Sequence, residues 1–311
     1  MPDEEHGIAP APLGGEEPTF IERFHISPVL FVFLVLAAVF FLYQVLGGLV
    51  TYIVAGSGVT AENARLVRGL TAAAELLLMF LPALAFARLA SHRVAPFVRY
   101  RSASLWLILA SLIGLLALQE VLQVYLYLQD QMPVPRSIAP VLEQFKNLIE
   151  ETYRLLVTAH SPAETLVVVV TISLVPALCE ETLFRGVVLH SLEKEMRPGW
   201  AVGLSAILFA GFHFDPFAFV PLMVLGGYFG FLTVRSGSIY PAMTAHFANN
   251  AVAVLAVFYG IDDRMIVGAA AQKVPTVTLF LNIVVFSAVF MGALAAVLRL
   301  THRRGGHVGA A

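Results

Sequence analysis

Long apolar stretches, separated by short polar ones, make up most of the chain. Several of them exceed the roughly 18 apolar residues that mark a membrane-spanning helix. We therefore predict an all-α protein, a polytopic transmembrane helical bundle with about eight spans, of which the fifth is the shortest. The apolar stretches cover approximately residues 26–54, 70–89, 105–128, 165–189, 200–214, 217–234, 241–258 and 274–298.

The segment of residues 138–159 has a different pattern, because charged residues alternate there with apolar ones. Apolar positions that recur near a period of 3.6 are typical of an amphipathic helix. We predict such a helix, lying at the membrane interface rather than across the membrane. Its apolar positions include Val141, Phe145, Leu148 and Leu155.

Composition supports a membrane protein and excludes some other classes. Hydrophobic residues make up 59% of the chain and charged residues only 13%, whereas soluble domains average about 25% charged residues. The formal net charge of −2 gives no electrostatic basis for binding nucleic acid. The single cysteine, Cys179, excludes an intramolecular disulfide and a cysteine-cluster metal site.

Lys and Arg are distributed unequally between the two sides that alternating spans define. With eight spans, both termini share a side that collects eleven of these residues, while the other side collects seven. We therefore predict that both termini are cytoplasmic. As a separate expectation, the protein lies in the plasma membrane. The richer side holds Arg23, Arg88, Arg93, Arg99, Arg101, Lys194, Arg197, Arg235, Arg299, Arg303 and Arg304; the other holds Arg65, Arg68, Arg136, Lys146, Arg154, Arg264 and Lys273.

Three charged residues lie within the fourth apolar stretch, at Glu180, Glu181 and Arg185. A charge at membrane depth costs roughly 2.5–3.5 kcal/mol and usually marks a functional site. Glu181 and Arg185 are four positions apart, so they share a helix face and can form an ion pair. Glu180 points about 100° away from that face. It is therefore the unpaired acid, and we expect the chemistry there.

Two histidines, His213 and His246, also lie inside or at the edge of apolar stretches. A single histidine in a core is more often a structural residue than a ligand. Two of them on separate helices, together with the Glu180–Glu181 pair on a third, favour a functional site. Asn250 follows His246 by four positions, so both side chains project from one face.

Glu75 and Glu120 are further acids in apolar stretches. We favour a structural role for both, with hydrogen bonds to polar neighbours such as Arg68, Gln119 or Gln123. A path for substrate or protons is the alternative.

Three motifs occur in order between residues 165 and 258. Together they resemble the signature of the CPBP family, which groups type II CAAX prenyl endopeptidases with bacteriocin-processing and self-immunity membrane proteins. The resemblance covers residues 165–258. The residues before about 161 support it only because they contain additional spans. The motifs are Glu180-Glu181-x-x-x-Arg185, Phe209-x-x-x-His213 and His246-x-x-x-Asn250.

The resemblance implies an intramembrane endopeptidase that hydrolyses a peptide bond near the membrane surface. In that interpretation Glu180 activates the attacking water as general base. His213 and His246 bind a metal or polarise the scissile carbonyl, and Asn250 donates a hydrogen bond to the oxyanion. The expected partners are a peptide or protein substrate, with a lipid-modified one among the family's options, and membrane lipids.

A metal requirement is left open at this point. Glu180, His213 and His246 are a donor set that can bind a divalent metal, with Zn²⁺ as the candidate. If Glu180 ligates the metal, however, it is less available as a base. Glu181 and Arg185 are expected to support the helix and orient Glu180.

The chain divides into five segments on this interpretation. Two alternatives to a protease remain: a non-proteolytic scaffold or immunity protein that uses the same pocket, and a small-solute or proton transporter. The segments are a disordered acidic tail at 1–25, transmembrane helices with the interfacial helix at 26–160, the CPBP-like catalytic core at 161–260, a final span at 261–300 and a basic tail at 301–311.

Overall fold

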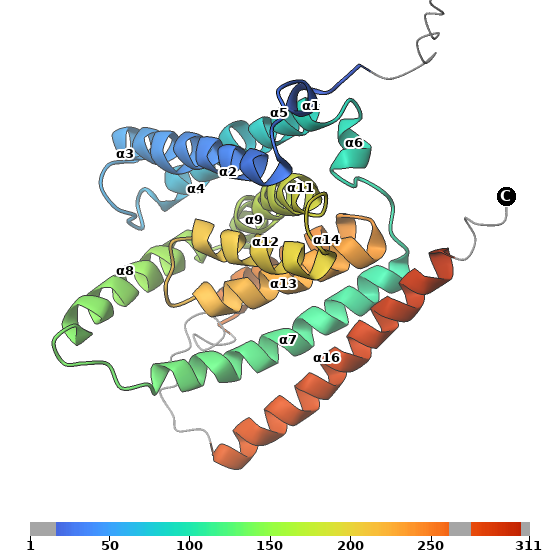
Figure 1. Ribbon diagram of the computed structural model, residues 1–311. Coiled ribbons are helices and arrows are strands. Elements are labelled where there is room, and N and C mark those ends of the chain that lie inside the picture. Colours follow the sequence, from blue (N-terminus) through green and yellow to red (C-terminus); the bar gives the residue numbers. More distant parts are fainter. Residues whose placement is uncertain (1–16, 261–274, 306–311) are drawn as a thin grey trace, which may run out of the picture.

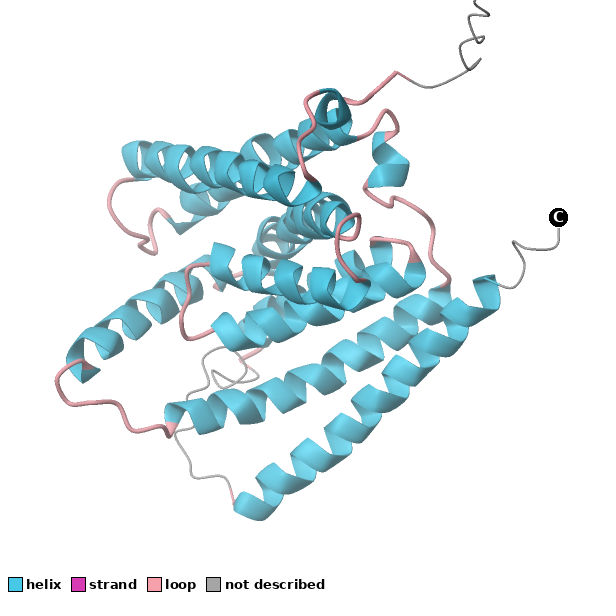
Figure 2. Ribbon diagram, in the orientation of Figure 1, coloured by secondary structure: helices cyan, strands magenta, loops and turns pink. Residues whose placement is uncertain are grey.

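The computed structural model describes residues 17–260 and 275–305, which form helices joined by short loops (Figure 1). No strand occurs among these residues (Figure 2). The prediction of an all-α helical bundle is confirmed.

The first two spans form one layer of the bundle. Ser27 caps the first of them by accepting a hydrogen bond from the backbone N–H of Leu30, and Pro28 occupies the first turn, where a missing N–H costs nothing. Each span contains a wider π-helical segment between α-helical ones. The elements are α1 (Phe20–Arg23), α2 (Pro28–Val39), η1 (Phe40–Gly47), α3 (Gly48–Ala55), α4 (Ala64–Ala74), η2 (Glu75–Phe80), α5 (Leu81–Ala90) and α6 (Val94–Phe97).

A long pair of helices, α7 (Leu105–Asp130) and α16 (Thr276–Gly305), packs side by side along the opposite edge of the bundle (Figure 1). Gly114 of α7 leaves room for Tyr228, whose hydroxyl donates a hydrogen bond of 2.7 Å to the carbonyl oxygen of Ser111. The α7–α16 pair is thereby tied to the centre of the bundle.

The fourth span lies between these two edges and forms the core. All eight residues of its segment η4 are buried, and the span contacts α2, η2 and α5 on one side and α12, α13 and α14 on the other. Its elements are α9 (Pro162–Val169), η3 (Val170–Leu174), α10 (Val175–Glu181), η4 (Thr182–Leu189) and α11 (His190–Leu192); α12 (Pro198–Phe212), α13 (Phe219–Ser236) and α14 (Tyr240–Phe258) follow.

Seven of the described helices are long and apolar enough to cross a membrane. The eighth apolar helix, α12, has only 15 residues, which gives a length of about 22 Å against a hydrocarbon core of about 30 Å. It packs against α13 as a helical hairpin. The predicted count of about eight spans therefore holds, and the fifth is the short one.

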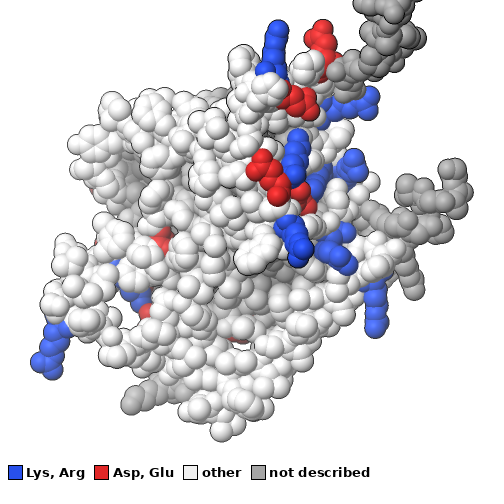
Figure 3. All heavy atoms as spheres, in the orientation of Figure 1, with Lys and Arg blue, Asp and Glu red and all other residues white. Residues whose placement is uncertain are grey.

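The surface has the polarity of a membrane protein. Large apolar side chains such as Trp106 and Trp200 are 70% and 75% exposed, and exposed apolar surface of this extent marks contact with lipid or protein. Charged side chains gather at one end of the face shown in Figure 3, near α1 and α6. The chain is an integral, multi-pass membrane protein.

Three helices lie at or near predicted segment bounds. Helix α1 begins within the segment 1–25, where a capping box between Thr19 and Glu22 starts it and Ile21 is buried. The last helix continues to Gly305, beyond the predicted end at residue 300. The amphipathic segment forms α8 (Ala139–Val157), whose apolar residue Val141 is 68% exposed. Residues 1–16, 261–274 and 306–311 lie outside the described residues.

Candidate active site

Glu180 and Glu181 lie at the end of α10, where the helix changes to the π-helical η4. Such π turns rotate the side chains that follow them relative to a regular α-helix and are frequent at functional sites. The Glu181 side chain is completely buried, whereas that of Glu180 is 15% exposed. Adjacent carboxylates therefore face different surroundings.

Glu181 forms the predicted ion pair with Arg185. Arg185 donates to the Glu181 Oε1 atom at 2.9 Å and to the carbonyl oxygen of Gly226 at 3.0 Å. Its guanidinium also lies 4.4 Å from the ring centre of Phe209 and 5.3 Å from that of Phe229. Hydrogen bonds and cation–π contacts of this kind are needed to offset the desolvation of a buried ion pair.

His246 joins this ion pair, which the sequence did not indicate. The His246 Nδ1 atom lies 2.8 Å from the Glu181 Oε1 atom, and its ring stacks on Phe229 at 5.3 Å with an interplanar angle of 16°. A carboxylate ion-paired to Arg185 can only accept, so Nδ1 carries the hydrogen. The Nε2 atom of His246 is left facing Glu180, at 3.9 Å from its Oε2 atom.

His213 approaches Glu180 from the end of α12. Its Nδ1 atom lies 2.8 Å from the carbonyl oxygen of Phe209, one turn earlier, so Nδ1 again carries the hydrogen. Its Nε2 atom lies 3.7 Å from the Glu180 Oε2 atom. The helix ends here because Phe214 adopts a left-handed backbone conformation, with φ of 54°. The His213 side chain is 29% exposed, so the site is accessible.

Three hydrogen-bond acceptors thus face one another, because a histidine with hydrogen on Nδ1 has a lone pair on Nε2. These are Glu180 Oε2 and the Nε2 atoms of His213 and His246. The Glu180 Oε2 atom is buried and has no hydrogen-bond partner among the described residues. A buried group in this state requires a donor or a cation. A water molecule can donate to two of these atoms, a proton can be shared by two of them, and a metal ion can bind all three.

The donor chemistry of this group fits zinc. Both histidines have the outer hydrogen bond that orients metal-binding imidazoles, to a backbone carbonyl in His213 and to a carboxylate in His246. Two ligands of a tetrahedral zinc lie about 3.3–3.6 Å apart, and the observed separations are 3.7 and 3.9 Å. As the described side chains are placed, no three His, Cys, Asp or Glu residues form a metal-binding cluster.

Asn250 lies on α14, and a chain of amides holds it. Gln119 Nε2 donates to Asn249 Oδ1 at 2.8 Å, and Asn249 Nδ2 donates to Asn250 Oδ1 at 3.0 Å. Asn250 Nδ2 in turn donates to the carbonyl oxygen of Ile172 at 3.3 Å. Asn250 Nδ2 carries a second hydrogen besides the one in this bond. The sequence did not indicate the roles of Gln119 and Asn249.

Glu75 takes a different partner from the one expected. Tyr43 donates a hydrogen bond of 3.2 Å to the Glu75 Oε1 atom, while Arg68 pairs with Glu164 at 3.2 Å. The Glu75 Oε2 atom is buried without a hydrogen-bond partner among the described residues, and its carboxylate interacts electrostatically with Glu180. The structure therefore adds Tyr43 and Glu75 to the surroundings of the candidate site.

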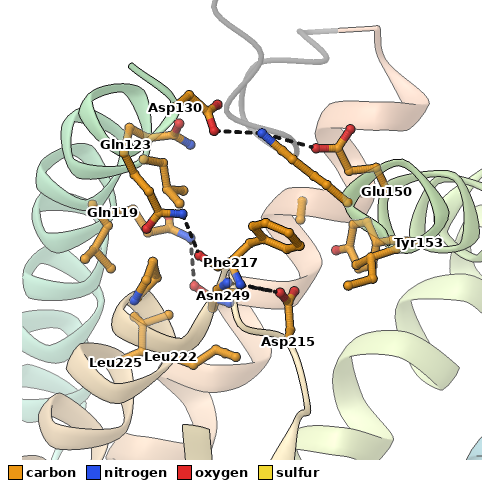
Figure 4. Close-up of a pocket in the computed structure, with 18 residues that line it drawn as sticks. Gln119, Gln123, Asp130, Glu150, Tyr153, Asp215, Phe217, Leu222, Leu225 and Asn249 are labelled. Carbon is orange, nitrogen blue, oxygen red and sulfur yellow. Dashed lines mark hydrogen bonds and ion pairs between the residues drawn. The ribbon is translucent and has the colours of Figure 1, made fainter. Parts of the chain in front are cut away.

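A cleft of about 350 Å³ opens between α7, α8, α13 and α14 (Figure 4). None of the four candidate catalytic residues lines it. It reaches the amide chain at Gln119 and Asn249, and it includes Asp215, which follows His213 by two positions. The cleft thus shares Gln119 and Asn249 with the amide chain that holds Asn250.

Comparison with known families finds one similarity, and it lies in the core. Residues 162–252 match the family described as type II CAAX prenyl endopeptidase Rce1-like. This range contains all six residues of the predicted site, from Glu180 to Asn250. No curated protein and no solved structure matches the chain. The match supports a membrane endopeptidase in general, and it confirms the family resemblance of the three motifs: the chain is a multi-pass membrane protein whose residues 162–252 are similar to the Rce1-like family.

Proposed function

We propose that the protein is an intramembrane endopeptidase in which Glu180 acts as the general base. One observation carries the proposal: the buried Glu180 Oε2 atom, without a hydrogen-bond partner among the described residues, faces the Nε2 atoms of two histidines. A water molecule between them can donate one hydrogen to Glu180 and the other to a histidine. Its lone pair then points away from the three acceptors, toward a substrate carbonyl carbon.

The reaction follows from this placement. Glu180 removes a proton from the water as the water oxygen bonds to the carbonyl carbon of the scissile peptide. The carbonyl oxygen becomes an oxyanion, to which Asn250 donates the free hydrogen of Nδ2. Glu180 then delivers its proton to the leaving nitrogen, and the carbon–nitrogen bond breaks. His246, fixed by Glu181, and His213 keep the water oriented throughout.

A divalent metal, with zinc as the candidate, is a second form of this proposal. Glu180, His213 and His246 would hold it, and when bound it would polarise the carbonyl and lower the pKa of a coordinated water. The test is purified protein treated with EDTA or phenanthroline, with metal content measured in parallel. Lost activity that added zinc restores supports the metal; full activity in protein shown to be metal-free rejects it.

The function itself is tested by finding cleaved substrates. Membranes containing the native chain or its Glu180→Gln variant are compared by proteomics of peptide ends. We expect new peptide ends only with the native chain, because a carboxamide cannot accept the proton of water. Identical peptide ends in both samples would reject proteolysis. A Glu180→Gln protein that keeps the cellular phenotype would favour a scaffold or immunity role.

We also propose that the termini lie in the cytoplasm and that the membrane is the plasma membrane. Lys and Arg side chains gather at the end of the bundle near α1 and α6 (Figure 3), and such residues favour the cytoplasmic side. Cys179 is buried, so added cysteines can be labelled selectively. In intact cells a membrane-impermeant maleimide should label Gln131→Cys and spare Arg197→Cys. The reverse labelling would invert the orientation.

A further inference from the structure

The first span contacts the end of α12, although this span lies outside the range that matches the family. The ring of Phe40 in η1 lies 6.2 Å from that of Phe212 and 5.5 Å from that of Phe214, measured between ring centres. These two phenylalanines flank His213 in the sequence. Gln44, four positions after Phe40, donates a hydrogen bond of 3.0 Å from its Nε2 atom to the carbonyl oxygen of Phe212. The first span therefore contacts the chain on both sides of His213.

The carbonyl group of Phe212 needs a donor from outside its own helix. In a continuous α-helix this carbonyl would accept a hydrogen bond from the residue four positions later. That residue is Pro216, which has no backbone N–H. The last carbonyl groups of a helix are satisfied by side chains, water or ligands instead, and Gln44 does so for Phe212. The sequence at the end of α12 thus leaves an acceptor that the first span satisfies.

The backbone hydrogen bonds of the last turn of α12 are long. The nitrogen atom of His213 lies 3.3 Å from the carbonyl oxygen of Ala210. The nitrogen atom of Phe214 lies 3.3 Å from the carbonyl oxygen of Gly211, whereas such distances are most often about 2.9–3.0 Å. The bond from Gln44 is shorter, at 3.0 Å, and ties this turn to a second helix. Its loss is therefore expected to loosen the turn that carries His213.

A second polar residue of η1 also points into the bundle. Tyr43, next to Gln44, donates its hydrogen bond to Glu75, whose carboxylate interacts electrostatically with Glu180. Leu46, two positions after Gln44, is 40% exposed and belongs to the outer face of the same helix. Adjacent polar residues of one span thus reach the surroundings of both the acid and the more exposed histidine of the candidate site.

We propose that Gln44 is a positioning residue for the reaction. It holds the end of α12, and thereby keeps the His213 Nε2 atom near the Glu180 Oε2 atom, 3.7 Å away. Gln44 acts through His213 and does not touch the substrate in this role. The reaction then depends on the first span as well as on residues 162–252. This inference rests on the proposed endopeptidase function.

Chemical modification of His213 tests the contact independently of cleavage. Gln44→Met removes the amide donor and keeps a side chain of similar length. The full-length protein in detergent is treated with diethyl pyrocarbonate, which acylates an imidazole nitrogen that carries no hydrogen, and mass spectrometry follows each histidine. We expect Gln44→Met to raise the rate at His213 about fivefold, as for the loss of one hydrogen bond. The rate at His246 should stay unchanged, because Glu181 holds that ring.

Leu46→Met is the matched control, because it places the same side chain on the outer face of the same helix. It should change the rate at neither histidine. An unchanged rate at His213 in Gln44→Met would overturn the proposal. So would an equal rise at His213 and His246 with a lower unfolding temperature, because that result would mean a general loss of stability.

Peptide cleavage tests whether this position matters for the reaction. Gln44→Met should lower kcat about tenfold and leave KM unchanged, because His213 orients the water and not the substrate. Leu46→Met should change neither constant. A rise in KM with an unchanged kcat would contradict a role through His213 and overturn the proposal.

The two measurements separate this inference from the function. Faster modification of His213 in Gln44→Met, without cleavage of any peptide by the native chain, would support the contact and reject proteolysis. Cleavage that Gln44→Met leaves unchanged would support proteolysis and overturn the positioning role of Gln44.

Discussion

Two neighbouring carboxylates on one helix have opposite environments. Glu181 is fully buried, and its Oε1 atom is bonded to Arg185 and His246 at 2.9 and 2.8 Å. Glu180, one position earlier, is partly exposed and its Oε2 atom has no hydrogen-bond partner among the described residues. The Glu181 Oε2 atom is also buried without such a partner, so the two carboxylates differ in the ion pair and histidine bond of Glu181 and in the partial exposure of Glu180. Our proposal is that Glu181 holds the structure and that Glu180 does the chemistry.

The two carboxylates nevertheless depend on each other through His246. Its Nδ1 atom is held by Glu181, and this contact directs its Nε2 atom toward Glu180. The same arrangement, a carboxylate that orients an imidazole for work on its other nitrogen, fixes the tautomer in many catalytic sites. The bonds among Arg185, Glu181 and His246 therefore set the position of the His246 Nε2 atom that faces Glu180.

The largest effect is expected from removing Arg185, which is bonded to Glu181. Arg185→Leu leaves the Glu181 carboxylate buried without its counter-charge, which costs about 3–5 kcal/mol of folding stability. Thermal unfolding of the purified protein in detergent measures the loss. Arg197→Leu is the control, because Arg197 is exposed and its loss should change little. Equal unfolding temperatures for the two variants would show that the buried pair does not hold the core.

A smaller effect, on rate rather than stability, is expected at the amide chain. Asn249→Leu removes the donor to Asn250 Oδ1 and frees the Asn250 carboxamide to rotate. Misplaced catalytic groups cost about 10- to 100-fold in rate, so kcat should fall in this range while the unfolding temperature changes little. Asn282→Leu is the control, because Asn282 lies on α16 and does not belong to the chain of amides at Gln119, Asn249 and Asn250. An unchanged kcat would show that Asn249 does not position Asn250.

The smallest effect is expected at Tyr43, which donates a hydrogen bond to Glu75. Tyr43→Phe removes the hydrogen bond to Glu75 Oε1 and leaves a carboxylate without a partner among the described residues on either oxygen. The loss of stability should be about 1–3 kcal/mol. Tyr52→Phe serves as the control, since Tyr52 is 60% exposed. Equal stability of both variants would mean that the Tyr43–Glu75 contact contributes nothing.

The features that depend on one helix alone could be predicted from the sequence. Apolar length gave the spans, and the spacing of Glu181 and Arg185 gave their ion pair, because residues four apart share a face. The order of the three motifs gave the family resemblance that the match of residues 162–252 confirms. The roles of the site residues remain predictions that the geometry supports.

Contacts between helices were harder to predict. The bond from Glu181 to His246, and that from Gln119 to Asn249, depend on how two helices are rotated about their axes. The π-helical segments change this rotation and leave no apolar pattern of their own. Glu75 was assigned neighbours near in sequence, but its partner Tyr43 lies on another span.

The most direct test of the division between the two carboxylates compares Glu180→Gln with Glu181→Gln in purified protein. Each variant is measured for peptide cleavage and for its unfolding temperature. We expect Glu180→Gln to lose at least about 10²-fold in kcat with an unchanged unfolding temperature, and Glu181→Gln to unfold at a clearly lower temperature. Full cleavage by Glu180→Gln, or the reverse distribution of the two effects, would contradict the account.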